Sequence, residues 1–312
     1  MAPRNFTCYY YQPFRSGADN VQYDFEHFIN IIDEHDDEVW QIIQDYGHGH
    51  QIRINDITFH SNFQPCQLNR PLPYSLYHII YTRIRTDRPC VVSMDTPTIE
   101  RLPLENGRNI GETVNILYDP ELNIVLMQRN ITGVSKNGVE KFLNNLLPET
   151  QDRLTFAPLI RSDILQQLCS ATVCKELTVR LVDSSDAETQ EWARSNPTVG
   201  GVVNNSCETN MVRMQYEVTL KPTPRSDSLI NMEAFRHLVN SAVDLIFRGK
   251  ISKLTAKVDS SPQPLNLINA SAKECIKIDV PADNFIPDST IFDEMAYQYS
   301  RRREEVRQML GV

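Results

Sequence analysis

The chain has 312 residues, of which 41% are apolar and 23% are charged, a composition typical of a globular protein and unlike that of a disordered one. No stretch approaches the ~20 uncharged apolar residues of a membrane-spanning helix, and the first residues lack the apolar core of a signal peptide, so we expect a cytoplasmic protein. The net charge of −9 at first sight disfavours a nucleic-acid partner. The seven cysteines include no CxxC pair, which favours reduced thiols over disulfides or a zinc knuckle.

Strands and one helix are predicted for the first part of the chain. The aromatic, β-prone segment Asn5–Gln12 predicts an opening strand. Segment Tyr23–Asp33 has apolar residues at the i, i+3, i+4, i+7 spacing of an amphipathic helix. Segment Gln51–Phe59 alternates around an Asn-Asp pair and predicts a hairpin, and Leu76–Ile84 predicts a further strand.

A long loop rich in proline and polar residues is predicted between residues 87 and 111. Two strands follow, Thr113–Tyr118 and Asn123–Arg129, joined by a segment with good turn residues. Segment Val139–Leu147 predicts a short helix that Pro148 ends.

Helices and strands alternate in the second half. Segment Met211–Lys221 has a strict period of two, which predicts a strand with one buried face. We expect two domains, an acidic α+β domain at 1–155 and an α+β domain at 156–312 that is the candidate for DNA binding and dimerisation. The mixture of helices, strands and hairpins favours an α+β fold with mixed or antiparallel sheets, packed helices and a long C-terminal helix. The other predicted elements of this half are helices at 162–168, 187–194, 232–247 and 289–310, and strands at 176–182, 251–258 and 273–280.

Motifs for catalysis are absent. The sequence has no GxSxG elbow, no phosphate-binding loop and no HExxH pair. The segment Gly47-His48-Gly49-His50 has no carboxylate at a fixed spacing, which favours a solvated turn over a metal site. We therefore expect no catalytic residues, metal or cofactor. A metal-dependent nuclease, in which several carboxylates would converge on Mg²⁺, remains an alternative.

The basic residues of the second half come in clusters, although residues 160–312 carry 18 Lys and Arg against 20 Asp and Glu. A strand at 251–258 would carry Lys253, Thr255 and Lys257 on one face. A second cluster, in the terminal helix, includes Arg301, Arg302 and Arg303. The alternative for both clusters is a solvated surface without a ligand, which in the helix would be stabilised by i, i+4 ion pairs. The candidate DNA-binding residues are Arg213, Lys221, Arg248, Lys250, Lys253, Lys257, Arg301, Arg302, Arg303 and Arg307.

The terminal helix has a predicted buried stripe, because four apolar residues fall at i, i+3, i+4 and i+7. At ~100° per residue, Arg301 points away from this stripe, Arg302 lies just outside it and Arg303 falls on it. We therefore expect Arg301 and Arg302 to contact phosphates. Arg303 is the weaker candidate for such a contact, and of the three arginines it is the one for which we expect a structural role. The stripe residues are Phe292, Met295, Ala296 and Tyr299.

The segment Ser289–Arg303 (STIFDEMAYQYSRRR) resembles the closing helix of the RexA family, the phage-exclusion proteins of lambda-type prophages. Segment Phe156–Arg161, the strand pair at 113–129 and segment Phe142–Leu146 are compatible with the same family. KwaB of the Kiwa anti-phage system is more distantly similar. The resemblance implies a dimeric binder of double-stranded DNA that acts in abortive infection beside a membrane-protein partner.

These considerations lead to one main hypothesis and two alternatives. The main hypothesis is a non-catalytic sensor or effector of an anti-phage system, which binds double-stranded DNA as a homodimer and acts with a partner protein. The first alternative is a metal-dependent nuclease in phage defence. The second is an interaction protein or inhibitor whose acidic N-terminal half mimics DNA.

Overall fold

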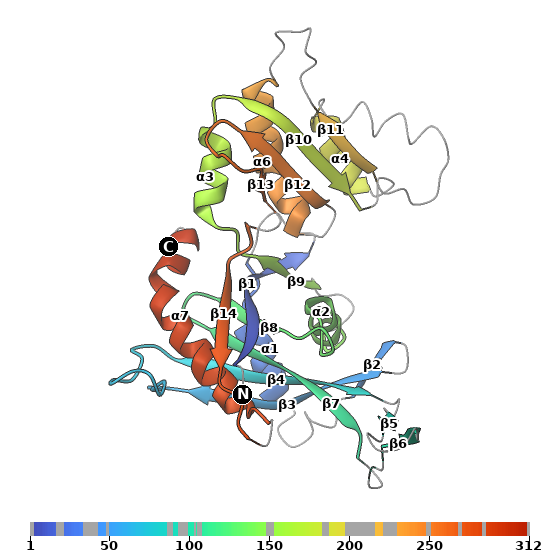
Figure 1. The fold of residues 1–312 in the computed structure, drawn as a ribbon, viewed down its shortest axis with the longest axis vertical. Coiled ribbons are helices and arrows are strands. Elements are labelled where there is room, and N and C mark those ends of the chain that lie inside the picture. Colours follow the sequence, from blue (N-terminus) through green and yellow to red (C-terminus); the bar gives the residue numbers. More distant parts are fainter. Residues whose placement is uncertain are drawn as a thin grey trace. The chain divides into compact units, whose positions relative to one another are not determined.

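The computed structural model divides the chain into two compact units (Figure 1). Unit 1 comprises Met1–Phe156 together with Lys273–Val312, and unit 2 comprises Ala157–Ala272. The first boundary lies one residue from the expected division, but the chain returns to unit 1 at Lys273, so that unit 2 does not extend to residue 312. The described residues are 3–16, 22–33, 43–47, 50–85, 90–92, 99–102, 104, 108–147, 153–182, 187–196, 216–220, 230–247, 251–267, 270–282 and 285–310.

Unit 1 is built on an eight-stranded sheet in the order β14-β1-β8-β7-β4-β3-β2, with β9 pairing with β1 off this path. The pairings along the path are antiparallel. The predicted loop at 87–111 contains a separate pair of three-residue strands, which are too short to show a sequence period. The strands are β1 (Arg4–Ser16), β2 (Gln44–Gly47), β3 (His50–His60), β4 (Leu76–Arg85), β5 (Cys90–Val92), β6 (Ile99–Arg101), β7 (Ile110–Asp119), β8 (Ile124–Arg129), β9 (Arg153–Pro158) and β14 (Lys273–Ile278).

The predicted hairpin at Gln51–Phe59 is wrong, because these residues belong to the single strand β3. The register with β4 shifts between Ile54 and Asp56, so Asn55 is the extra residue of a β-bulge. A bulge inserts one residue and lets the alternation resume beyond it. The Asn-Asp pair therefore marks an irregularity within a strand and not a turn. The predicted turn between β7 and β8 is confirmed, with Asn123 at a φ of 49°.

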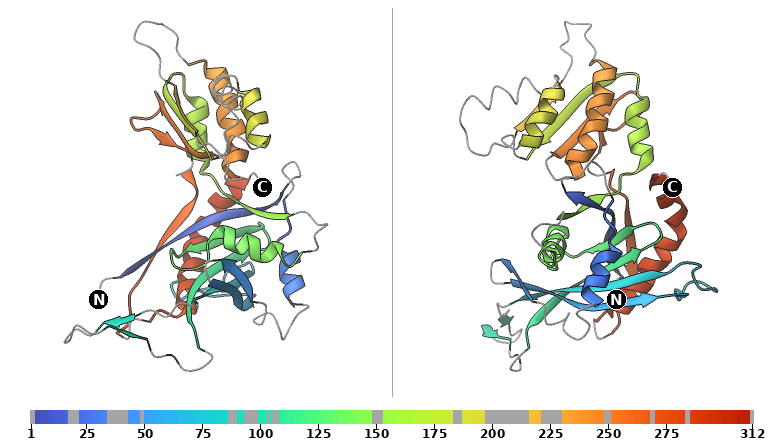
Figure 2. Two further views of the ribbon diagram at one scale, coloured as in Figure 1. Left: turned by 90° about the vertical axis from the view of Figure 1, so that its right-hand side faces the viewer. Right: turned by 180° about the vertical axis from the view of Figure 1, so that it is seen from behind.

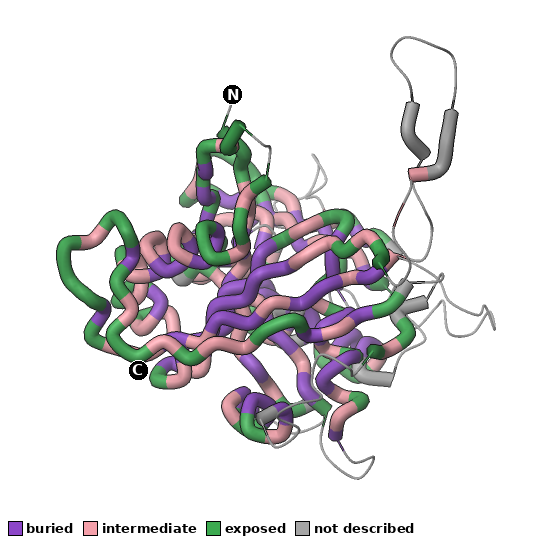
Figure 3. Tube along the Cα trace, turned by 90° about the horizontal axis from the view of Figure 1, so that it is seen from below, coloured by how far each residue is buried: buried purple, intermediate pink, exposed green. Residues whose placement is uncertain are grey.

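Helices lie on both faces of the unit 1 sheet (Figure 2). On one face, α1 (Glu26–Asp33) and α2 (Lys136–Asn144) contribute to a large apolar core. The long helix α7 (Asp288–Leu310) packs on the other face, against β7 and β14. The buried residues run along the strands between these layers (Figure 3). The predicted stripe of α7 is confirmed, because Phe292, Met295, Ala296 and Tyr299 are all buried.

Unit 2 has helices on one face of a four-stranded antiparallel sheet in the order β11-β10-β12-β13. Its helices and the inner face of its sheet share one apolar core. In the part of this unit that the structure describes, the other face of the sheet carries no helix (Figure 2). The elements are α3 (Ser162–Ser170), β10 (Cys174–Leu181), α4 (Ala187–Ser195), β11 (Tyr216–Leu220), α6 (Met232–Phe247), β12 (Ile251–Val258) and β13 (Leu265–Asn266).

The α+β class is confirmed, with antiparallel sheets, packed helices and a long C-terminal helix. The period of two predicted for 211–221 holds in β11, where Val218 is buried and Glu217 and Thr219 are exposed. Residues 211–215 and 221 lie outside the described residues. None of the helices within the described ranges combines the length and the apolar content needed to cross a membrane.

Candidate nucleic-acid interface

The strand face predicted to contact DNA lies on the open side of the unit 2 sheet. In β12, Leu254 and Ala256 are buried in the core, whereas Lys253 and Lys257 alternate with them and point to the other side. Lys257 is exposed and forms no ion pair within 4.0 Å among the described residues, although Glu176 of β10 is opposite it in the register. This part of the prediction is confirmed as far as the direction of the side chains is concerned.

A carboxylate offsets much of the positive charge on this face. Glu217 accepts hydrogen bonds from Arg180, whose Nε lies 2.7 Å away, and from the Nζ of Lys253 at 3.1 Å. The pKa of Glu217 is lowered, first by the hydrogen bond from Arg180 and then by that from Lys253. The register explains the cluster, because Arg180 of β10 is opposite both Glu217 of β11 and Lys253 of β12. The candidates Arg213, Lys221, Arg248 and Lys250 lie outside the described residues.

Arg303 of α7 lies against the sheet of unit 1. Its Nε donates to Oδ2 of Asp119 at 2.7 Å, and its Nη2 donates to Oε2 of Glu121 at 2.6 Å. Its guanidinium group also lies 4.0 Å from the centre of the Tyr74 ring. The side chain is only 13% exposed. Arg303 thus joins the end of β7 to α7, in keeping with its predicted place on the buried stripe.

Arg302 and Arg307 are also bound to carboxylates. Arg302 donates through Nη1 to Oε1 of Glu274 at 2.7 Å and through Nη2 to Oε1 of Glu305 at 2.8 Å. Arg307 donates to Oε1 of Glu121 at 2.8 Å. Burial is the largest influence on Glu274 and raises its pKa, although Arg302 acts in the opposite direction. Within the described part of α7, Arg301 has no carboxylate partner and is exposed, 5.7 Å from the Tyr297 ring centre.

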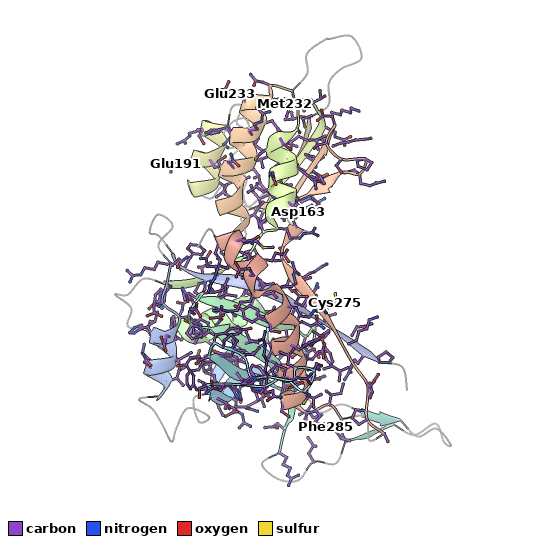
Figure 4. All side chains as sticks on the ribbon, turned by 90° about the vertical axis from the view of Figure 1, so that its left-hand side faces the viewer. Asp163, Glu191, Met232, Glu233, Cys275 and Phe285 are labelled. Atoms are coloured by element: carbon purple, nitrogen blue, oxygen red, sulfur yellow. The ribbon has the colours of Figure 1, made fainter. Side chains whose placement is uncertain are left out.

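A second cluster of cations lies on the face of strands β14, β1 and β8 that points away from α7. Glu274 of β14 and Tyr10 of β1 are buried on the α7 side, where the hydroxyl of Tyr10 donates to Glu274 at 3.0 Å. Because side chains alternate along a strand, the flanking residues Lys273, Cys275 and Lys277 point to the opposite side, and all three are exposed. Figure 4 labels Cys275 in the middle of this row.

Arg129 of β8 belongs to the same face. Cys275 is opposite Thr7 of β1, and Thr7 is opposite Arg129, and residues directly opposite in antiparallel strands share a face. Lys273 and Lys277 are separated by ~13 Å along β14, and Arg129 lies ~10 Å across from the point midway between them. We call Arg129, Lys273 and Lys277, with Asn5, Thr7 and Tyr9 of β1 between them, the basic sheet face.

No carboxylate among the described residues pairs with the three cations of the basic sheet face. Arg129 instead donates to the hydroxyl of Tyr9 at 3.4 Å. Beside it is a hollow of about 460 Å³, whose lining includes Tyr9, Arg83, Arg129 and Lys136. Arg83 donates to the carbonyl of Thr132, and Lys136 is paired with Glu140 at 2.8 Å. Arg129 therefore lies beside a second guanidinium group, that of Arg83, whereas the charge of Lys136 is offset by Glu140.

This surface was not predicted from the sequence, because Arg129 and the two lysines are far apart in the chain. The signal that was available is the alternation in Lys273–Ile278, which places Lys273, Cys275 and Lys277 on one face of a predicted strand. The pairing of β14 with β1 was not available from the sequence.

The comparisons with known proteins supply a family but no activity. No curated protein matches the chain. A model described as a family of unknown function (DUF6731) matches residues 1–307. The match covers nearly the whole length, including both units and most of α7, and the chain therefore belongs to the DUF6731 family.

Proposed function

We propose that this protein binds the phosphate backbone of double-stranded DNA without catalysing a reaction, and that the basic sheet face of unit 1 is the main contact. The observation that carries the proposal is a set of three exposed cations, two on β14 and one on β8 across the intervening strand β1, with no carboxylate partner among the described residues. In a chain with a net charge of −9, such a concentration of unpaired positive charge on one sheet face indicates an anionic ligand.

The geometry suits a polyanion better than a small anion. The three cations are spread over ~10–13 Å, several times the ~3.4 Å rise between successive phosphates of one DNA strand. They are therefore too far apart to converge on one phosphate, but they can each meet a separate phosphate of one duplex. Asn5, Thr7 and Tyr9 add hydrogen-bonding groups of the kinds that contact phosphates in protein–DNA complexes.

Two residues from the predicted site are additional candidates. Lys257 on the open face of unit 2 and Arg301 on α7 are exposed and have no carboxylate partner among the described residues. Arg302, Arg303 and Arg307 contribute to the attachment of α7, since their guanidinium groups are bound to Glu274, Asp119 and Glu121 outside the helix.

The biological setting that we propose is phage exclusion, with the protein acting as a homodimer beside a membrane-protein partner. The support for this setting is the resemblance of Ser289–Arg303 to the closing helix of the RexA family. Phage plating on cells with and without the intact protein tests it. We expect fewer plaques with the intact protein, and equal plaque numbers would argue against this role.

DNA binding is tested by fluorescence anisotropy with a short labelled duplex over a series of salt concentrations. The test variant combines Arg129→Gln, Lys273→Gln and Lys277→Gln. Each lost phosphate contact reduces the slope of log K against log salt by ~0.9, so loss of all three contacts reduces it by up to ~2.7. The matched control combines Arg70→Gln, Lys141→Gln and Lys175→Gln, three exposed positions with the same total charge.

We expect the control to bind as the wild type does and the test variant to bind more weakly with a flatter salt response. Equal affinity and slope for the two variants would remove the basic sheet face from the interface. A wild-type protein that binds no duplex at low salt would overturn the proposed function. Cleavage of the duplex in the presence of Mg²⁺ would replace it with the nuclease alternative.

A further inference from the structure

Ile131 is an unusually exposed apolar residue in a segment that continues from the basic sheet face. Its side chain is 86% exposed, compared with 65% for Phe285 and 46% for Ile43. It lies two residues beyond Arg129, after the end of β8. Single apolar residues on a surface are common, so exposure alone does not indicate a function for Ile131. Its immediate structural surroundings do.

The loop that carries Ile131 is held in place on both sides of it. Before Ile131, the side chain of Asn130 donates to the carbonyl of Thr113 at 3.1 Å and accepts from the backbone N–H of Thr132 at 3.2 Å. After Ile131, the carbonyl of Thr132 accepts from Arg83 at 3.1 Å. Gly133 packs so closely on Val114 that an added Cβ would lie 2.7 Å from a methyl group of that valine. The loop therefore presents Ile131 on a fixed backbone.

Ile131 also lies on a ridge between two hollows. Arg129, Asn130 and Ile131 line both the hollow of about 460 Å³ and a second one of about 420 Å³. The first hollow also has Arg83 and Lys136 in its lining, and the second has Arg4 together with Glu112. An exposed isoleucine thus lies at a boundary with basic side chains on either side.

We propose that Ile131 is an apolar wedge that inserts between base pairs of the bound duplex. This inference rests on the proposed function and adds to it a way of deforming the DNA. Proteins that kink DNA insert apolar side chains such as Ile between base steps, usually from the minor groove, and bend the duplex by ~20–90°. The cations on either side would hold the phosphates that flank the opened step. A braced loop suits this role, because little conformational freedom is lost when it binds.

The test compares Ile131→Ala with the control Ile43→Ala, which truncates another exposed isoleucine in unit 1. The bend is measured by energy transfer between dyes at the two ends of a duplex, and affinity by anisotropy at several salt concentrations. We expect wild type and the control to bring the dyes closer together. We expect Ile131→Ala to leave the energy transfer near that of free duplex while the salt slope is unchanged, because the phosphate contacts remain.

A duplex with one mismatched pair gives a second readout, because a mismatch lowers the energy needed to unstack a base step. Wild type should prefer the mismatched duplex, and Ile131→Ala should lose that preference. A wild-type protein that binds without bending overturns the wedge alone, whereas one that binds no duplex overturns the proposed function as well. A normal bend in Ile131→Ala also overturns the wedge. If that variant bends DNA normally and changes the monomer–dimer equilibrium, Ile131 contacts a second copy of the protein instead.

Discussion

Asp119 should be the most important single charge for the attachment of α7. It is the last residue of β7, and its side chain is fully buried. One oxygen, Oδ2, accepts from the hydroxyl of Tyr299 at 2.6 Å and from Nε of Arg303 at 2.7 Å. The other accepts from the backbone N–H groups of Glu121 and Leu122, at 2.9 and 3.2 Å. The substitution Asp119→Asn keeps the size of the side chain and removes its charge.

The magnitude follows from what remains around Arg303 after the substitution. Removing one partner of a buried ion pair typically destabilises a protein by ~3–5 kcal/mol. Arg303 keeps its bond to Glu121 and its contact with the Tyr74 ring, so we expect the lower end, ~3 kcal/mol. In a unit of this size, each kcal/mol lowers the Tm by ~2–4 °C, which gives a decrease of roughly 6–12 °C.

The assay is thermal unfolding followed by circular dichroism and calorimetry. Glu121→Gln is the matched control, because it removes the other carboxylate bound to Arg303. The side chain of Glu121 is 55% exposed. Glu121 also binds Arg307, and each such pair contributes up to ~1 kcal/mol, so the control should lower the Tm by less than ~8 °C and by less than Asp119→Asn does. If Asp119→Asn lowers the Tm no more than Glu121→Gln does, the buried pair does not hold α7 on the sheet.

Three further predictions concern other parts of the molecule. Burial lowers the pKa of His78, so protonation of this side chain favours the unfolded state, and the stability of the protein should fall as the pH decreases below ~6.5. Urea unfolding at neutral and acidic pH should show this decrease, and His78→Gln should make it smaller. Gly133→Ala should destabilise the protein by ~1–3 kcal/mol through overpacking against Val114, measured by calorimetry; an unchanged Tm would show that the loop adjusts freely. Lys257→Gln should reduce the salt slope of duplex binding by up to ~0.9. Lys253→Gln should reduce that slope by a smaller amount, because Glu217 already binds this lysine. Equal reductions of the slope in anisotropy titrations would contradict this ranking.

Patterns that repeat within one helix or strand were predictable from the sequence. The buried stripe of α7 and the structural place of Arg303 follow from a period of 3.6 residues. The outward direction of Lys253 and Lys257 follows from a period of two. In these cases the deciding neighbours are two to four residues away, so the local sequence contains the information. Even here the Asn55-Asp56 pair was misinterpreted, because a bulge and a turn favour similar residues.

What only the tertiary structure decided depends on pairs of residues far apart in the chain. The pairing of β14 with β1 returns the C-terminal segment to unit 1 and brings Lys273 and Lys277 onto the same face as Arg129. Similarly, the partners of Arg302 and Arg303 include Glu274 and Asp119 on distant strands, so a helical projection alone could not show that Arg302 is bound. Strand order and register are set by the packing of both faces of the whole sheet, and the placement of charges on those strands follows from that packing.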